Sequence, residues 1–365
     1  MIKLAYVINY ITNNGPSRVI LDIIKYLDKE TFNISLITLF PENKPEIISF
    51  LKGNGIKIYE CKTLSRRKCL QGKSQEFNKI IEDNSFDIIH THGIIPDVLS
   101  SHIKIPAKKV STLHNNMFED YLDSYGYIKS RIFIAMHLVA LKKLDLCVCC
   151  SKSVYDVMKQ YLVNTTYIRN GIEPAKARSV ITRKQLGIPD NARLFLYAGV
   201  LNTRKNVVWL AQNFVKCRSD NEFLLVLGKG EKEVECQAVA DDHVKLLGFQ
   251  SDPAAYMQIS DVYISASRSE GFSISVLEAI SMGLGLFLSD IPSHRETIEM
   301  ASDIYIGELF SEKSFARKIS ELRNKQFQKE EISRFQHMSA SAKSMSKNYQ
   351  SSYKQLLCEG QLWKK

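Results

Sequence analysis

Short apolar runs alternate with amphipathic stretches along most of this chain. Apolar runs of about four to eight residues predict strands, and in the first half they lie at residues 4–8, 33–40, 56–59, 87–90, 109–113 and 146–150, with amphipathic helices such as 17–27 and 74–81 between them. The pattern then restarts, with strands at 194–198, 222–227, 244–247, 262–265 and 285–289 and helices that begin near residues 206, 232, 253, 273 and 293. Because strands that alternate with helices form parallel sheets with right-handed crossovers, the fold class expected is α/β, with two doubly wound units in succession.

The length of 365 residues fits two domains. Their junction is predicted within 165–190, a polar and basic stretch that contains Asn170-Gly171 and two prolines. We therefore expect a first Rossmann-like domain over 1–168 and a second over 169–340. The tail, 341–365, is polar with spaced Met, Tyr and Leu residues, and we expect it to form a last helix that packs back on the first domain.

Composition is that of an ordinary globular protein, with 45% hydrophobic and 24% charged residues. The N-terminal run 1–10 is too short for a secretory signal and is predicted to be the first strand. The longest apolar stretch, 128–146, is interrupted by lysine and arginine residues, which argues against a membrane span. Cys147, Cys149 and Cys150 share one apolar run, a pattern typical of buried thiols. These features favour a reduced, cytoplasmic protein.

The net charge of +10 is concentrated in the first half of the chain, because residues 1–170 hold 23 basic and 16 acidic residues, a net charge of +7. One basic stretch is 61–73, and a second, 118–145, interleaves aromatic residues with cations: Phe118, Tyr121, Tyr125, Tyr127 and Phe133 with Lys129, Arg131, Lys142 and Lys143. A solvated face over core aromatics and a surface that binds an anionic membrane both fit this pattern. Nucleic acid is the least favoured partner, because no nucleic-acid-binding motif is visible.

The most informative segment is 265–283, Ser-Ala-Ser-Arg-Ser-Glu-Gly-Phe-Ser-Ile-Ser-Val-Leu-Glu-Ala-Ile-Ser-Met-Gly. A strand ends at Ser265, a loop holds Glu270, and a helix starts near Ser273, so the segment lies at the ligand-binding edge of an open α/β sheet. Glu278 follows about a turn and a half into that helix. Helix-start N–H groups bind anions or hydroxyls, and carboxylates accept hydrogen bonds from vicinal hydroxyls, so a sugar or ribose ligand is favoured over the common alternative of two surface glutamates.

This segment resembles the donor-site signature of the retaining glycosyltransferases of family 4, which have the two-domain GT-B fold. The resemblance spans most of the chain, because seven further segments match motifs of that family in order: the glycine-rich first loop at 14–18, the fourth-strand motif at 87–93, the strand with the active-site histidine at 111–115, the interdomain segment at 167–172, the pyrophosphate loop at 198–206, and nucleotide-contacting loops at 227–230 and 247–252. It implies two Rossmann-like domains that face each other across a cleft, the first binding the acceptor and the second the nucleotide-sugar donor.

The resemblance also implies a role for each matching residue. Lys205 would neutralise the pyrophosphate leaving group, and Arg204 would supply the second cation where relatives carry an arginine at the position of Val200. Glu270 would hold the hydroxyls of the donor sugar, and Glu278 would hold the ribose diol. Further donor-binding residues that the resemblance implies are Gly15, Gly228, Gly271, Phe272 and Ser273.

The histidines and one aromatic residue leave alternatives open. His114 matches the family residue near the transferred sugar, which makes it a candidate catalytic group, with a structural histidine as the alternative. His92 is a candidate acceptor-side contact, or a strand-end histidine bonded to the main chain. His90 lies on the same side of the strand end as His92, but without a third ligand at a defined spacing we expect no metal. Phe249 is expected either against the nucleobase or in the core.

The activity implied is that of a nucleotide-sugar-dependent enzyme, a hexosyl- or N-acetylhexosaminyltransferase that retains the anomeric configuration and needs no cofactor. The acceptor expected is a lipid-linked glycan of bacterial O-antigen, capsule or other envelope polysaccharide, reached by a peripheral protein at the inner face of the cell membrane. Three alternatives remain: a soluble acceptor, another sugar-nucleotide enzyme on the same scaffold such as an epimerase or phosphorylase, and a non-catalytic basic membrane-binding module.

Overall fold

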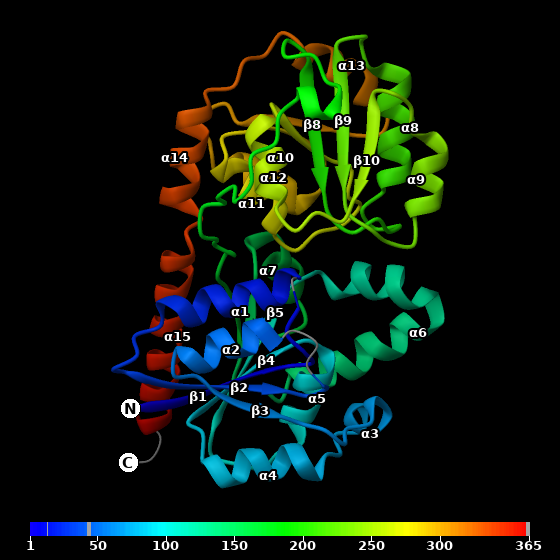
Figure 1. The fold of residues 1–365 in the computed structure, drawn as a ribbon. Coiled ribbons are helices and arrows are strands. Elements are labelled where there is room, and N and C mark those ends of the chain that lie inside the picture. The colour runs from blue at the N-terminus through cyan, green and yellow to red at the C-terminus, as the bar shows by residue number, and fades with distance from the viewer. Residues whose placement is uncertain (13, 42–44, 363–365) are drawn as a thin grey trace. The chain divides into compact units, whose positions relative to one another are not determined.

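The computed structural model describes residues 1–12, 14–41 and 45–362 (Figure 1). The chain divides into two compact units, each with its own sheet. The first unit contains Met1–Gly171 together with the C-terminal segment that starts at Ala342, and the second contains Ile172–Ser341. The prediction of two α/β units in succession is confirmed.

In the first unit, the described residues form a seven-stranded parallel sheet of order β3-β2-β1-β4-β5-β6-β7. Its strands are β1 (Ile2–Ile8), β2 (Phe32–Thr38), β3 (Lys57–Glu60), β4 (Ile88–His92), β5 (Lys108–Leu113), β6 (Leu146–Cys149) and β7 (Thr165–Tyr167). The helices of this unit are α1 (Gly15–Tyr26), α2 (Pro45–Gly53), α3 (Arg66–Leu70), α4 (Gln75–Asn84), α5 (Ile94–His102), α6 (Met117–Leu141), α7 (Lys152–Met158) and α15 (Ala342–Leu362).

The second unit repeats the same architecture with a six-stranded parallel sheet, of order β10-β9-β8-β11-β12-β13, within the part of the chain described. Its strands are β8 (Arg193–Ala198), β9 (Glu222–Leu227), β10 (Val244–Gly248), β11 (Val262–Ser265), β12 (Gly285–Ser289) and β13 (Gly307–Phe310). Its α-helices are α8 (Val207–Cys217), α9 (Glu233–Val239), α10 (Pro253–Ile259), α11 (Ile274–Ser281), α12 (Pro292–Glu299), α13 (Phe315–Leu322) and α14 (Lys329–Ser339).

Two strands were not anticipated from the sequence. β7 lies within the stretch that was interpreted as a linker, yet Cys147 to Cys149 pair with Thr165 to Tyr167 and make it the last strand of the first sheet. β13 extends the second sheet beside β12. Both strands are short and only partly buried, so neither carries the apolar run that marks a buried strand.

Apolar side chains fill the faces of both sheets. The central strand β1 is buried from Leu4 to Ile8, as expected for a parallel strand covered by helices on both sides. Helix α1 begins after Asn14, whose side-chain oxygen accepts a hydrogen bond from the Ser17 N–H, and it has proline in its first turn. Cys147, Cys149 and Cys150 are buried free thiols, as predicted.

Helix α15 packs against α1 in the first unit. Its Ser346 hydroxyl donates to the Ile23 carbonyl, and the Gln350 amide donates to the Tyr26 carbonyl. Tyr349 and Tyr353 of the same helix are fully buried in this unit. The last helix therefore completes the core of the first unit, although more than 300 residues separate it from α1 along the chain.

Helix α6 is bent. Gly126 has φ 71° and ψ 175°, values outside the helical region, so the helix changes direction there. Only glycine adopts such a conformation without strain, which explains why the long amphipathic segment has two arms. Among the described residues, no helix is both long enough and apolar enough to cross a membrane.

Candidate functional site

The first part of the candidate site is the loop between β8 and α8. Asn202 accepts a hydrogen bond from the Lys205 N–H at 3.0 Å through its side-chain oxygen, and the Arg204 carbonyl accepts one from the Arg268 N–H at 2.8 Å. Asn206 ends the loop with φ 54°, in the left-handed region where asparagine is tolerated. These contacts fix Lys205 two residues before the first residue of α8, in agreement with a helix that begins near residue 206.

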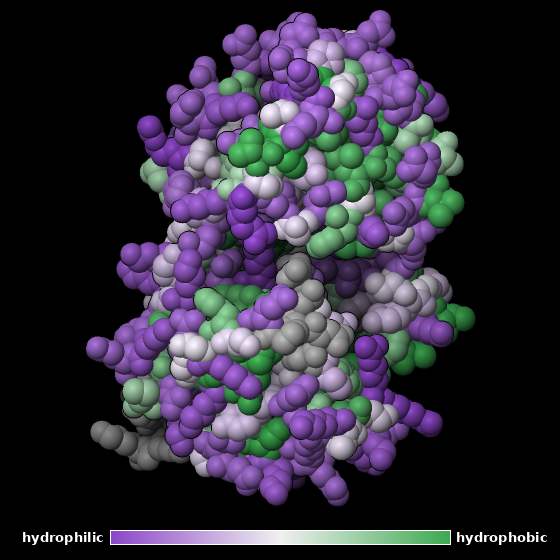
Figure 2. Space-filling view, viewed as in Figure 1, coloured by the Kyte–Doolittle hydropathy of each residue, from purple (hydrophilic) through white to green (hydrophobic). Residues whose placement is uncertain are grey.

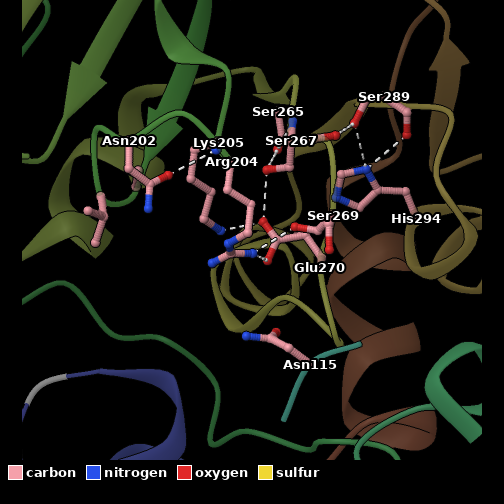
Figure 3. A network of polar contacts seen from close by, with 12 residues as sticks. Asn115, Asn202, Arg204, Lys205, Ser265, Ser267, Ser269, Glu270, Ser289 and His294 are labelled. Carbon is pink, nitrogen blue, oxygen red and sulfur yellow. Dashed lines mark hydrogen bonds and ion pairs between the residues drawn. The ribbon is translucent and has the colours of Figure 1, made fainter. Parts of the chain in front are cut away.

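Glu270 is the centre of a network of polar contacts in the second unit (Figure 3). Its Oε1 forms an ion pair with Lys205 Nζ and accepts a hydrogen bond from the Ser267 hydroxyl at 2.8 Å. Its Oε2 lies 3.0 Å from Arg204 Nη1, which also donates to the Ser269 carbonyl at 2.7 Å. The three charged side chains are largely buried, with exposures of 7% for Glu270, 15% for Lys205 and 17% for Arg204.

Electrostatics keep this carboxyl ionised. Burial alone would raise the pKa of Glu270, but the charges of Lys205 and Arg204 and the Lys205 hydrogen bond outweigh it and lower the pKa to about 2. Nearby, His294 Nδ1 lies 2.9 Å from the Ser289 carbonyl, and burial lowers the pKa of this histidine to about 4. The site therefore presents two cations and one carboxylate at neutral pH, which suits a ligand with both anionic and hydroxyl groups.

The remaining donor-side candidates lie on neighbouring loops of the same unit. Ser273 immediately precedes α11 and follows Gly271 and the buried Phe272. Glu278 lies in the middle of α11 and is 7% exposed. The segment 262–281 thus has the strand–loop–helix form expected from the sequence, with helix-start N–H groups next to the carboxylate-bearing loop.

The geometry explains the glycine at position 228 and decides between the two alternatives for Phe249. Gly228 follows β9 with φ 142°, and a Cβ at this position would lie 1.8 Å from the Gly199 carbonyl oxygen, so only glycine fits. Phe249 is 61% exposed, so the core-packing alternative for this residue is wrong. It remains available for contact with a ligand. Gly15 is the first residue of α1 in the other unit.

In the first unit, three histidines form a row across the ends of β4 and β5. The rings of His90 and His92 have centroids 4.4 Å apart, and those of His92 and His114 are stacked at 5.1 Å. His92 Nδ1 lies 2.8 Å from His114 Nε2. Tyr353 Oη and Thr112 Oγ1 lie 2.6 and 2.8 Å from the two ring nitrogens of His90. Both polar atoms of His90 are therefore satisfied within the core, so its role is structural.

Burial keeps these three imidazoles neutral. It lowers the pKa of His114 to about 4, and burial together with the charge of His114 lowers the pKa of His90 to about 3. The pKa of His92 is also lowered, by burial and then by the neighbouring histidines. His92 Nε2 is buried and has no hydrogen-bond partner, which distinguishes it from the strand-end histidine bonded to the main chain that was the alternative.

The row ends at a cavity of about 270 Å³, close to the lower end of the 300–1,000 Å³ that is typical of small-molecule pockets. His92, His114, Asn115, Asp120 and Tyr121 are among its lining residues. Tyr121 also belongs to a buried chain of hydrogen bonds with His137 and Asp97. Sequence reasoning missed this chain, because its members lie on two helices and share no spacing motif. Among the described residues, no group of three His, Cys, Asp or Glu side chains is placed to hold a metal ion.

Two successive doubly wound units, with a cluster of cations and a carboxylate in loops of the second, have the architecture of the GT-B fold. The structure of Anabaena HepE in complex with UDP shares this fold, with a TM-score of 0.76 and 15% identity over 97% of this chain and 100% of that one. The profile described as "Glycosyltransferase Family 4" matches residues 13–176, and the one described as "Glycosyl transferases group 1" matches residues 180–343. The two profiles together cover most of the chain, which is a nucleotide-sugar-dependent glycosyltransferase of the group 1/family 4 type.

Two curated relatives cover most of the chain. The O-antigen biosynthesis glycosyltransferase WclY of Escherichia coli is 29% identical over 313 residues, 81% of this chain and 82% of that protein. The UDP-Gal:alpha-D-GlcNAc-diphosphoundecaprenol alpha-1,3-galactosyltransferase of the same species is 26% identical over 86% of each chain. The recognition of the family from its motifs is therefore confirmed.

Proposed function

We propose that this enzyme transfers a hexosyl or N-acetylhexosaminyl group from a nucleotide diphosphate sugar to a lipid-linked glycan of an envelope polysaccharide, with retention of configuration. The observation that carries the lipid-linked acceptor is the exposed apolar and basic surface of α6, where Tyr127, Ile128 and Ile132 lie beside cations. It is supported by the relative whose named substrate is a sugar diphosphate of undecaprenol and which matches 86% of this chain.

In the proposed donor complex, Lys205 and Arg204 meet the pyrophosphate. Both cations lie in one loop and both already contact Glu270, so an incoming diphosphate shares them with this carboxylate. Glu270 retains lone pairs that can accept hydrogen bonds from the hydroxyls of the sugar. Glu278 holds the ribose diol, and the exposed Phe249 lies against the base. Lys205 and Arg204 supply the charge neutralisation of the leaving group, so the proposal includes no metal.

The proposed chemistry is substitution on one face of the sugar. Double displacement uses two carboxyl groups about 5 Å apart, one of which attacks the anomeric carbon. Glu270 is a poor nucleophile, because its two oxygens are held by Lys205, Arg204 and Ser267. In the step proposed here, the bond from the anomeric carbon to the diphosphate breaks, the acceptor oxygen forms its bond on the same face, and the departing diphosphate takes the proton of the acceptor hydroxyl.

Retention is expected at the anomeric carbon of the product. The test is a proton NMR spectrum of the disaccharide unit formed from an α-linked nucleotide sugar, selected from a panel of UDP-, GDP- and dTDP-sugars by release of the nucleotide. An α-linked product agrees with the proposal. A β-linked first product contradicts the front-face step, and release of no nucleotide from any donor contradicts the transferase role.

The surface of α6 that supports the acceptor proposal consists of Tyr127, Ile128 and Ile132 with Lys129 and Arg131, hereafter the α6 surface. The three apolar side chains are 64%, 75% and 63% exposed. Figure 2 shows hydrophobic side chains gathered at the outer end of α6, at the right of the view. Arg131 lies over the ring of Tyr127 at 4.8 Å, and residues 127–143 include no acidic residue. Exposed apolar groups beside cations suit an anionic membrane interface.

Binding to anionic vesicles is expected to depend on the α6 surface. Burying a large apolar side chain contributes about 1.5–3 kcal/mol, so the double variant Ile128→Ser/Ile132→Ser should bind at least about tenfold more weakly. Flotation with phosphatidylglycerol-containing liposomes at low salt measures the binding. The control is Val163→Ser, which removes a 97% exposed apolar side chain outside α6 in the same unit and should leave flotation unchanged. Failure of the unmodified protein to float contradicts the membrane part and favours a soluble acceptor.

A further inference from the structure

A chain of three buried side chains joins α5 to both arms of α6. The Tyr121 hydroxyl lies 2.7 Å from His137 Nδ1, and His137 Nε2 lies 2.7 Å from Asp97 Oδ2. Asp97 also accepts a hydrogen bond from the Thr91 hydroxyl through its other oxygen. The exposures of Asp97, His137 and Tyr121 are 0%, 3% and 9%. Asp97, His137 and Tyr121 are separate from the residues proposed to bind the donor and the membrane.

The order of donors and acceptors along this chain is set by Asp97. A carboxylate only accepts hydrogen bonds, so Nε2 of His137 carries the proton that points toward Asp97. When the imidazole of His137 carries only this proton, its other nitrogen, Nδ1, is an acceptor, and the Tyr121 hydroxyl donates to it. The phenol oxygen keeps lone pairs that accept a hydrogen bond from another group. Burial, with the nearby carboxylates, raises the pKa of Tyr121, so its proton is retained.

Tyr121 lines the 270 Å³ cavity together with His92 and Asp120. His92 Nε2 is buried there without a partner, and whether it is a donor or an acceptor depends on its hydrogen bond with His114. A hydroxyl is able to satisfy it in either state, because a hydroxyl both donates and accepts. His92 is 3% exposed, so water does not readily satisfy its Nε2. Because a buried polar atom without a hydrogen-bond partner costs free energy, the cavity suits a polar ligand that supplies the missing hydrogen bond.

The lining favours a neutral ligand over an anion. Among the described residues that line the cavity, none is lysine or arginine, and one is the carboxylate of Asp120. Burial lowers the pKa of His92 and of His114 and keeps both neutral. A diphosphate placed here would meet no positive charge, whereas sugar hydroxyls would meet the Tyr121 oxygen, His92 and the amide of Asn115.

We propose that this cavity binds a neutral sugar ring of the acceptor and that Tyr121 accepts a hydrogen bond from one of its hydroxyls. Asp97 and His137 are positioning residues, which keep the proton of Tyr121 directed away from the ligand. The inference rests on the proposed transferase function, and it adds the part of the acceptor that this cavity recognises.

The test measures binding of neutral methyl hexosides, namely the methyl α-glycosides of glucose, galactose and their N-acetylamino derivatives, by saturation-transfer NMR titration of the full chain. We expect the unmodified protein to bind at least one of them and Tyr121→Phe to bind it at least tenfold more weakly. Tyr155→Phe is the matched control, because Tyr155 lies in α7 of the same unit and does not line the cavity. Equal binding by Tyr121→Phe, or no binding of any hexoside by the unmodified protein, overturns the inference.

The positioning role has its own readout. In Asp97→Asn, the amide can donate to His137 Nε2, which makes Nδ1 the donor and frees the Tyr121 hydroxyl to donate to the ligand. Deoxyfluoro analogues of the preferred hexoside distinguish the two states, since fluorine cannot donate. We expect the unmodified protein to reject one analogue at least tenfold relative to the parent sugar, and Asp97→Asn to narrow that ratio to about threefold or less. An unchanged ratio with retained folding, checked by circular dichroism, overturns the positioning role.

The binding readout separates this inference from the proposed function. If the enzyme transfers no sugar to a short-chain N-acetylglucosamine diphosphate lipid, the proposal of a lipid-linked acceptor is contradicted. Loss of hexoside binding in Tyr121→Phe alone still supports the cavity assignment in that case. If transfer occurs but Tyr121→Phe has the acceptor KM of the unmodified protein, the cavity assignment fails and the transferase function stands.

Discussion

Lys205→Ala is expected to lower kcat about 10²- to 10³-fold, with a smaller effect on the KM of the donor. Removing a preorganised group that stabilises charge developing in the transition state typically costs this much, about 3–4 kcal/mol of barrier. The negative charge on the departing diphosphate grows as its bond to the sugar breaks, so the stabilisation that we propose for the Lys205 ammonium is greater in the transition state than in the bound donor. Steady-state rates of nucleotide release at saturating acceptor measure the effect.

Two comparisons separate this role from a structural one. Lys205→Ala leaves Glu270 paired with Arg204 and Ser267, so the second unit is expected to fold. Lys232→Ala removes a cation of the same unit that pairs with Glu235 outside the site, and it should leave kcat unchanged. Near-normal kcat in Lys205→Ala contradicts the assignment, whereas an equal loss in both variants indicates a general effect of charge.

The candidate site of the second unit was largely predictable, because its residues occur in short segments next to strand ends. The order of Lys205, Glu270 and Glu278 along the chain and the glycines around them carried the signal, and the structure brings Lys205 and Glu270 into contact. The pairing of Arg204 with Glu270 was not predictable, since it depends on the path of the loop after β8. The exposure of Phe249 was not predictable either, because a lone aromatic residue after a strand is compatible with both core and surface.

The proposed acceptor site of the first unit was less predictable for a physical reason. His90 is hydrogen-bonded to Tyr353, which lies 263 residues later in the chain. The structural role of His90 therefore depends on a long-range contact. Tyr121 was grouped with the aromatic residues of a basic surface, yet it is buried and bonded to His137. Spacing cannot reveal such contacts, because the bend at Gly126 brings the two arms of α6 together.

The first unit is expected to lose stability as the pH falls from 6.5 to 5. The pKa of folded His114 is about 4 and that of His90 is about 3, both below the ordinary value of 6.5, so the unfolded chain binds more protons in this range. Between the two pKa values of a histidine, a fall of one pH unit lowers the free energy of unfolding by about 1.4 kcal/mol. His114 and His90 therefore each contribute a loss of about 2 kcal/mol by pH 5. Urea unfolding followed by far-UV circular dichroism at pH 7 and pH 5 measures the change.

His90→Gln tests the source of this loss, because its amide can bond to Tyr353 and Thr112 but does not titrate. The variant should lose about 2 kcal/mol less than the unmodified protein between pH 7 and pH 5, whereas His337→Gln, at an exposed position, should behave like the unmodified protein. Glu270 does not confound the comparison. Its pKa is lowered from 4.5 to about 2, so the stability that it contributes is present above pH 4.5 and is lost only below it. Unfolding free energies that are equal at pH 7 and pH 5 contradict the neutral, buried state of the histidine row.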